Sequence, residues 1–169
     1  MAETPRRVEL GEICAEAVDR CRNREPVPRV GVLETPAESL VSRERLLHVL
    51  EHVLRNAQDA TLKNGSVTVN LRRESHRALL EVVDTGEGMD AEFIRNRLFR
   101  PFDTTKGDRG MGIGAYEVRE YARKCGGDVQ VSSAPGEGTR FLISLPLAPA
   151  EFRTTAAPDD VLGDERQYR

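Results

Sequence analysis

One carboxylate and two glycines have the chemistry and the spacing to hold a flat, amine-bearing ring. Asp84 directly follows the apolar run 79–83, and Gly86 and Gly88 follow it at alternate positions. A carboxylate at the end of a strand accepts a hydrogen bond from an exocyclic amine such as that of adenine. The glycines let the backbone turn sharply and approach a purine without a Cβ in the way. These residues therefore indicate the base-binding side of a nucleotide site.

A second glycine cluster, Gly110, Gly112 and Gly114, begins a predicted helix that ends near Lys124. The N-terminus of a helix supplies both backbone N–H donors and a favourable dipole for phosphate groups. The polar loop before it contains Lys106, whose ammonium group is suited to the outer phosphates. We therefore expect the triphosphate of the nucleotide to lie at this helix N-terminus.

The pattern from Gly110 to Ala115 also fits the fingerprint of a dinucleotide-binding loop. That fingerprint requires an apolar strand immediately before its first glycine, whereas residues 104–109 are polar. We therefore favour a lid over a triphosphate. Lys106 on its own would be an ordinary surface lysine, and only its place in this loop indicates phosphate contact.

The predicted helix 43–63 has a polar face, on which residues three or four apart lie on one side: His52, Asn56, Asp59 and Ala60. Mg²⁺ prefers oxygen ligands and retains several waters, so the amide oxygen of Asn56 beside the phosphates would suffice as its protein ligand. Asp59 either orients Asn56 or a metal-bound water, or faces solvent. We expect this face to form a wall of the pocket.

The length and composition fit one domain with one core. The chain has 169 residues, 38% of them hydrophobic, and a formal net charge of −3, which gives no general attraction to nucleic acid or to anionic lipid. No apolar run is long enough to span a bilayer. The three cysteines form no CxxC pair, which argues against a disulfide framework or a zinc site. We expect a cytoplasmic domain that contacts neither nucleic acid nor membrane.

The periodicity of the chain predicts a two-layer α+β sandwich. Apolar residues at helical spacing predict a helix from Leu10 and another over 43–63, and alternation predicts hairpins over 67–83 and 128–145. We expect helices on one face of a mixed, mostly antiparallel sheet. The expected divisions are a linker over 1–9, a domain over 10–147 and a flexible tail over 148–169.

Several motifs follow one another in the order and spacing of a known family. They resemble the N, G1, F and G2 boxes and the last element of sensor histidine kinases: Asn56–Ala60, Asp84–Met89, Phe99–Phe102, Gly110–Gly114 and 136–141. Four boxes in register are a specific signal, whereas any one of them alone is weak. The runs 97–107 and 114–121 are similar, more narrowly, to the PrsK kinases of exosortase (PEP-CTERM) systems.

This resemblance implies the Bergerat (GHKL) ATP-binding fold, with ATP and Mg²⁺ as cofactors. Carried over box by box, it implies that the nucleotide is contacted by Asn56, Asp59, Ala60, Asp84, Gly86, Gly88, Met89, Phe102, Thr105, Lys106, Gly110, Met111, Gly112, Ile113, Gly114 and Thr139. The catalytic residues implied are Asn56 as the metal ligand, His52 and Lys106. The threonine of the last element, Thr139, is implied to lie near the phosphates.

In such kinases this domain passes the γ-phosphoryl group to a histidine on a separate helical dimerisation domain, and a response regulator then receives it. None of His48, His52 or His76 has the sequence context of that acceptor. We therefore expect a catalytic domain that is a monomer by itself, does not phosphorylate itself, and follows an acceptor domain located before residue 1. Membrane anchorage of a full-length kinase stays open.

His52 stands where relatives that hydrolyse ATP with water have a glutamate as general base. An imidazole with a pKa near ~6.5 is mostly neutral at cellular pH and is able to accept a proton. Phosphoryl transfer to a histidine nitrogen, however, depends mainly on positioning and charge neutralisation. We therefore favour His52 as a partner of magnesium-bound water over a general base.

Two other classes share the same boxes. An anti-sigma-factor kinase acts on a protein serine, but the missing glutamate and the residues 103–107 count against it. Other GHKL modules, such as an ATP-gated clamp or an inactive pseudokinase, are the remaining alternative. A clamp needs a long lid and a following transducer domain.

Overall fold

The computed structural model describes residues 4–101 and 114–150, which form a two-layer α+β sandwich. One layer is a five-stranded sheet with the strand order β2 (Arg29–Leu33), β4 (Val67–Glu74), β5 (Arg77–Asp84), β7 (Gly138–Pro146) and β6 (Asp128–Ala134). β2 runs parallel to β4, and the other neighbours are antiparallel. The other layer is built from α1 (Leu10–Arg20), α2 (Arg43–Ala60) and α4 (Ala115–Lys124).

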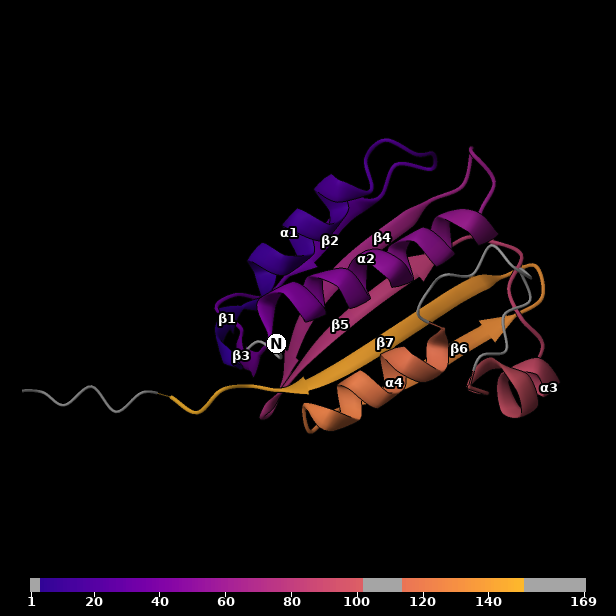
Figure 1. The fold of residues 1–169 in the computed structure, drawn as a ribbon. Helices are drawn as coiled ribbons and strands as arrows, with labels where there is room; N and C mark the ends of the chain where they lie inside the picture. The colour runs from indigo at the N-terminus through magenta and orange to yellow at the C-terminus, as the bar shows by residue number, and fades with distance from the viewer. Residues whose placement is uncertain (1–3, 102–113, 151–169) are drawn as a thin grey trace, which may run out of the picture.

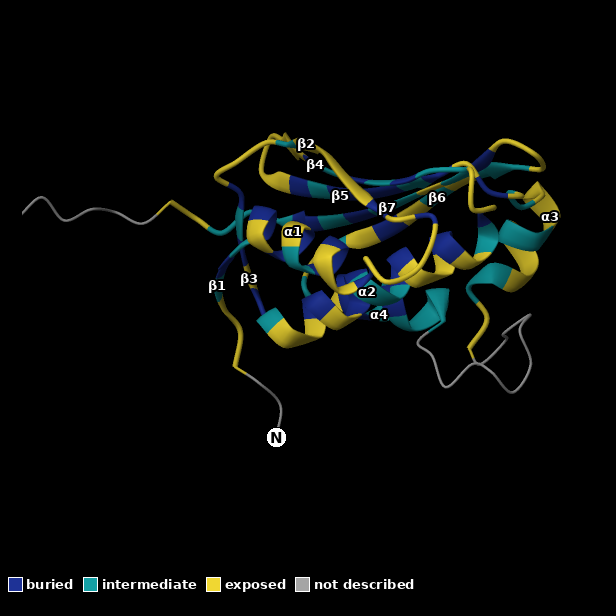
Figure 2. Cartoon of the chain, turned by 90° about the horizontal axis from the view of Figure 1, so that it is seen from above, coloured by how far each residue is buried: buried dark blue, intermediate teal, exposed yellow. Residues whose placement is uncertain are grey.

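The three long helices lie on the same face of this sheet, and within residues 4–101 and 114–150 no helix covers the opposite face (Figures 1 and 2). A short helix, α3 (Ala91–Phe93), continues as one π-helical turn over Ile94–Leu98 and lies beyond the end of the sheet (Figure 1). The mixed α+β fold and both predicted hairpins are thereby confirmed.

The core lies between the two layers and follows directly from the periodicity of the sequence. Val67, Val69 and Leu71 point from β4 toward the helices, and residues of α2 spaced by three and four meet them, including Leu47, Leu50 and Leu54. Figure 2 shows this buried stripe along the inner sides of both layers. Because the helices cover one face only, strands alternate between buried and partly exposed residues.

The helix that contains the predicted pocket wall begins as expected but ends earlier. The hydroxyl of Ser42 accepts a hydrogen bond from the N–H of Arg45 at 3.4 Å, which caps the start of α2. The helix ends at Ala60 rather than near Lys63, because Thr61 is extended and its hydroxyl donates to the carbonyl of Ala57 at 2.7 Å.

Residues 6–9 form a strand, which differs from the linker expected over 1–9. β1 (Arg6–Glu9) pairs antiparallel with β3 (Glu38–Val41) in a separate two-stranded sheet. Val8 is buried there, and Arg7 forms an ion pair with Glu38 at 2.9 Å. The sequence did not predict this strand, because pairing with a distant segment requires no alternation of apolar residues in so polar a stretch. The other expected domain limits stay predictions.

The three cysteines are free thiols. Burial raises the pKa of Cys14 to about 12, so this thiol behaves as a small core side chain. Within residues 4–101 and 114–150, no helix is both long and apolar enough to cross a membrane.

Candidate functional site

Three side chains lie in a row across one end of the sheet, on the face that the helices cover. Asp84 ends β5 and is the cross-strand neighbour of Thr139 on β7, which is in turn the neighbour of Ser133 on β6. Because side chains alternate along a strand, Asp84 shares its face with the core residues Leu80 and Val82. We call Asp84, Thr139 and Ser133 the strand-end row.

Asp84 is a buried carboxylate, only 6% exposed, and its partners are backbone groups. Its Oδ1 accepts hydrogen bonds from the N–H of Gly86 at 2.8 Å and of Thr139 at 3.2 Å. Among the described residues, none donates a hydrogen bond to Oδ2 or forms an ion pair with this carboxylate. Burial raises the pKa of Asp84, and the two N–H groups oppose that rise. Oδ2 is thus an acceptor suited to the amine of a ligand.

The backbone of the turn after Asp84 packs directly against the backbone of two other segments, one on each side. A Cβ on Gly86 would lie 2.4 Å from the carbonyl oxygen of Ala60, and the N–H of Glu87 donates to that same oxygen at 3.0 Å. Gly88 has a φ of +71°, and a Cβ there would lie 2.0 Å from the carbonyl oxygen of Ala134. Only glycine permits these approaches, so the turn is held between the end of α2 and the β6–β7 hairpin.

Ser133 was not singled out from the sequence, yet it connects the turn to the sheet. Its hydroxyl accepts from the N–H of Met89 at 2.8 Å, donates to the carbonyl of Gly138 at 2.8 Å, and lies 2.9 Å from the hydroxyl of Thr139. The signal that could have found it is the strand alternation of 128–133, which places it on the face of Val129.

The polar residues predicted on α2 separate into different environments. Asn56 is exposed and makes no hydrogen bond to another residue in the described part of the chain. His52 is partly exposed one turn earlier. Asp59 instead forms an ion pair with Arg24, in the loop after α1. Ala60 contributes its carbonyl to the glycine turn, as described above.

Gln58 faces the opposite way from Asn56 and holds the loop that carries Arg24. It is buried, and its amide nitrogen lies 3.0, 2.9 and 3.1 Å from the carbonyl oxygens of Cys21, Arg24 and Pro26. The loop after α1 is therefore fixed to α2 beside the Arg24–Asp59 pair. Sequence reasoning did not identify this role, because the contacts join residues more than thirty positions apart.

Gly114 lies at the start of α4, as predicted, but its backbone N–H already donates a hydrogen bond within the protein. The carboxylate of Glu117 accepts from it at 2.7 Å. Phe99 packs against the core, and the guanidinium of Arg119 lies 4.3 Å from the centre of its ring, so this aromatic anchors the residues after the π-helical turn to α4. The remaining predicted site residues lie outside the described part of the chain: Phe102, Thr105, Lys106, Gly110, Met111, Gly112 and Ile113.

The strand-end row and the glycine turn at the end of α2 lie together at one end of an α+β sandwich, with Asp84 Oδ2 as an acceptor suited to a small ligand. Residues 41–149, more than half of the chain, match the model of the family described as histidine kinase-, DNA gyrase B- and HSP90-like ATPases. The chain belongs to this family of ATPases.

The relatives found by sequence include sensor kinases. The chain is 36% identical over 105 residues to the sensor histidine kinase ZraS of Klebsiella oxytoca, an alignment of 62% of this chain and 22% of that protein. It is 35% identical over 113 residues to the C4-dicarboxylate transport sensor protein DctB of Rhizobium meliloti, which covers 66% of this chain and 18% of that protein. The chain thus spans about a fifth of the length of these relatives.

The solved structures agree with this assignment. The mycobacterial sensor histidine kinase MprB superimposes with a TM-score of 0.70 at 25% identity, covering 86% of this chain and 99% of that chain. Full-length ShkA in complex with AMPPNP has a TM-score of 0.74 at 23% identity, covering 89% of this chain and 32% of that chain, and is similar in fold. The chain is therefore homologous to the catalytic domain of sensor histidine kinases.

Proposed function

We propose that this chain is the ATP-binding catalytic domain of a two-component sensor histidine kinase. It would transfer the γ-phosphoryl group of ATP to a histidine on a separate dimerisation domain, for onward transfer to a response regulator. The observation that carries this proposal is Asp84, a buried carboxylate whose bonded partners are two backbone N–H groups, at the end of a central strand in a member of this ATPase family. An acceptor so placed suits the amine of adenine.

The donor set on α2 fits a magnesium ion that is shared with phosphate oxygens. Among the described residues there is no cluster of three or more histidine, cysteine or acidic side chains able to hold a metal alone. Asn56, exposed and without a hydrogen bond to the described residues, supplies one amide oxygen. Mg²⁺ accepts few protein ligands beside phosphates and water, so one such oxygen is sufficient. Bound there, the ion would neutralise phosphate charge during transfer.

The histidines of this chain are poorly placed to receive the phosphoryl group themselves. His48 and His52 belong to α2, and His76 lies at the β4–β5 turn. All three are fixed to the scaffold that would hold the nucleotide, whereas transfer needs an in-line approach of the acceptor. We infer that the acceptor histidine comes from another domain. The roles of His52 beside magnesium-bound water and of Lys106 at the phosphates stay predictions.

A labelling experiment tests this proposal. The domain should incorporate no phosphate from ATP and Mg²⁺ by itself, and should label a histidine-bearing helical hairpin that is added as a separate protein or fused before residue 1. The bond should be acid-labile and base-stable. Asn56→Ala should abolish labelling, and His48→Ala, an exposed change on the same helix, should leave it intact.

Other outcomes discriminate the alternatives. Acid-stable phosphate on a serine of a partner protein would favour an anti-sigma-factor type of kinase. Binding of ATP without transfer to any acceptor would favour a binding module of the GHKL class.

The finer proposal is that the parent kinase belongs to the PrsK group of exosortase systems. It is supported by the sequence similarity of the runs 97–107 and 114–121. Once the domain is fused to an acceptor domain of that group, phosphotransfer should be fastest to a response regulator of an exosortase system. Equal rates across unrelated regulators would contradict this placement.

A further inference from the structure

The hydroxyl of Ser133 has three partners, and their chemistry determines where its single proton lies. The carbonyl of Gly138, 2.8 Å away, can only accept, so it takes the proton of Ser133. The N–H of Met89, also at 2.8 Å, can only donate, so it occupies one lone pair. One lone pair is left for the hydroxyl of Thr139 at 2.9 Å. Thr139 is therefore the donor in that contact.

This assignment gives the hydroxyl of Thr139 a definite polarity toward the site. Its proton points at Ser133, so a ligand that reaches Thr139 Oγ1 meets lone pairs only. The backbone N–H of the same residue donates to Asp84 Oδ1 at 3.2 Å, which keeps Thr139 next to the carboxylate. Asp84 Oδ2 is an acceptor as well. The strand-end row thus presents two acceptors from neighbouring strands and no hydroxyl donor.

We propose that Ser133 is a specificity-determining positioning residue, which makes this site favour 6-amino purines over 6-oxo purines by holding Thr139 as a hydrogen-bond acceptor. The inference rests on the proposed binding of ATP at this site. An amine at the 6-position donates to acceptors, whereas an oxo group at the same position faces lone pairs and forms no hydrogen bond with them. Without the Ser133 hydroxyl, the proton of Thr139 is released and is able to point at a 6-oxo group.

The test compares ADP with inosine diphosphate, whose base has an oxo group at the 6-position and no 2-amino group. Affinities are measured by displacement of a fluorescent ADP analogue. Ser133→Ala should lower the preference for ADP over inosine diphosphate about tenfold, because the hydroxyl of Thr139 changes from an acceptor to a donor in one hydrogen bond. Ser132→Ala is the matched control: it lies on the same strand, faces the uncovered side of the sheet, and should leave the ratio unchanged.

Two further variants separate selectivity from loss of structure. Ser133→Thr retains a hydroxyl and suits a strand, so it should restore the ratio of the parent. In a Thr139→Val background, Ser133→Ala should have no further effect on the ratio, because the group through which it acts is absent.

An unchanged ratio, or an equal loss of both affinities, overturns the role of Ser133, while binding of ADP by the parent upholds the nucleotide site on which the proposed function depends. A parent protein that binds neither nucleotide overturns both.

Discussion

Asp84 and Glu81 are two carboxylates on the same strand, three residues apart and each 6% exposed, but they face opposite sides of the sheet. Strand alternation places Glu81 on the face opposite the long helices, where Asn70 donates to its Oε1 at 3.0 Å and Arg140 donates to its Oε2. Asp84 lies on the helix-covered face, with two backbone N–H groups on Oδ1. Burial acts on both carboxylates, and their partners differ.

Their pKa values accordingly shift in opposite directions. Burial pushes the pKa of Glu81 upward, but the hydrogen bonds from Asn70 and Arg140, together with the charges of Arg140 and Arg72, outweigh it and leave that pKa below its usual range. For Asp84, burial outweighs the backbone hydrogen bonds, so its pKa is raised. A carboxylate satisfied by a cation is a completed structural contact. A carboxylate satisfied on one oxygen only, under the helices, is available to a ligand.

The largest effect is expected at Gly138, where the start of β7 lies against the backbone at the end of β5. Gly138 has a φ of +82°, and a Cβ there would lie 2.0 Å from the carbonyl oxygen of Asp84. Gly138→Ala combines backbone strain with a backbone clash, so it should lower the free energy of unfolding by about 3 kcal/mol or more. Urea denaturation measures this loss.

Gly136→Ala is the matched control, because Gly136 has a φ of +78° but nothing within 4 Å of the added Cβ. It should cost roughly 1–2 kcal/mol from backbone strain alone. Equal losses in the two variants would mean that contact with the backbone of Asp84 does not hold the strand-end row.

The structural role of Glu81 is tested by removing the cation with which it pairs. Arg140→Gln leaves an ionised, buried carboxylate with fewer partners, and should lower the free energy of unfolding at neutral pH by about 1–3 kcal/mol. Arg72→Gln, which removes a charge near Glu81 that donates no hydrogen bond to it, should cost less.

The effect of Arg140→Gln also has a defined pH dependence. The folded-state pKa of Glu81 is lowered, so the stability that it contributes is present above its unfolded pKa and is lost as pH falls through its folded pKa. The variant and the parent should therefore converge in acid. A difference that is constant from neutral to acid pH would contradict the ionised pair.

Asp84→Asn tests the proposed role of Asp84 in ligand binding. The variant should lose affinity for ADP but gain thermal stability. An asparagine Oδ1 still accepts both backbone N–H groups, but its amide presents a donor to the amine of adenine. The affinity for ADP, measured by calorimetry, should fall roughly tenfold to a hundredfold.

The same variant should melt at a higher temperature than the parent at neutral pH. Because the folded pKa of Asp84 is raised, the stability supplied by its protonated form is present below the unfolded pKa and is lost as pH rises through the folded pKa. The variant does not titrate there, so its advantage should vanish in acid. A variant that binds ADP like the parent and melts at the same temperature would remove the assigned role of Asp84.

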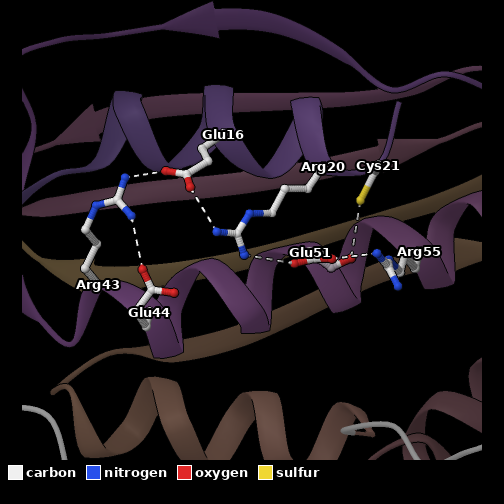
Figure 3. Close-up of polar contacts among 7 residues, drawn as sticks. All are labelled: Glu16, Arg20, Cys21, Arg43, Glu44, Glu51 and Arg55. Carbon is white, nitrogen blue, oxygen red and sulfur yellow. Dashed lines mark hydrogen bonds and ion pairs between the residues drawn. The ribbon is translucent and has the colours of Figure 1, made fainter. Parts of the chain in front are cut away.

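The smallest effect is expected in the ion pairs on the surface between α1 and α2, drawn in Figure 3. Glu51 of α2 pairs with Arg20 of α1 at 3.7 Å and with Arg55 at 2.6 Å. Glu51 is partly buried, but both arginines are exposed, so water and salt screen these pairs and Glu51→Gln should cost less than about 1 kcal/mol. Thermal melting at low and high salt checks this, and the difference should shrink with added salt. A larger cost than that of Arg140→Gln would reverse the comparison of buried and surface pairs.

The sequence alone determined the features that depend on local periodicity and on residue chemistry. Alternation predicted the hairpins, helical spacing predicted α1 and α2, and Ser42 caps α2 as expected. The structure brings Asp84, Gly86 and Gly88 together in one turn and places Thr139, expected near the phosphates, beside Asp84; their contacts with a nucleotide stay predictions. These features could be predicted because a strand, a cap or a tight turn is specified by a few neighbouring residues.

Only the tertiary structure decided which partners the polar groups acquire. Asp59, predicted in the pocket wall, pairs with Arg24, and Met89 donates to a serine 44 positions further on. Glu81 and Asp84 look alike in sequence, yet strand alternation and strand order place one beside Arg140 and the other beneath the helices. Such contacts join strands and loops that are distant along the chain. Their energies depend on burial and on cross-strand neighbours, which exist only once the sheet has formed.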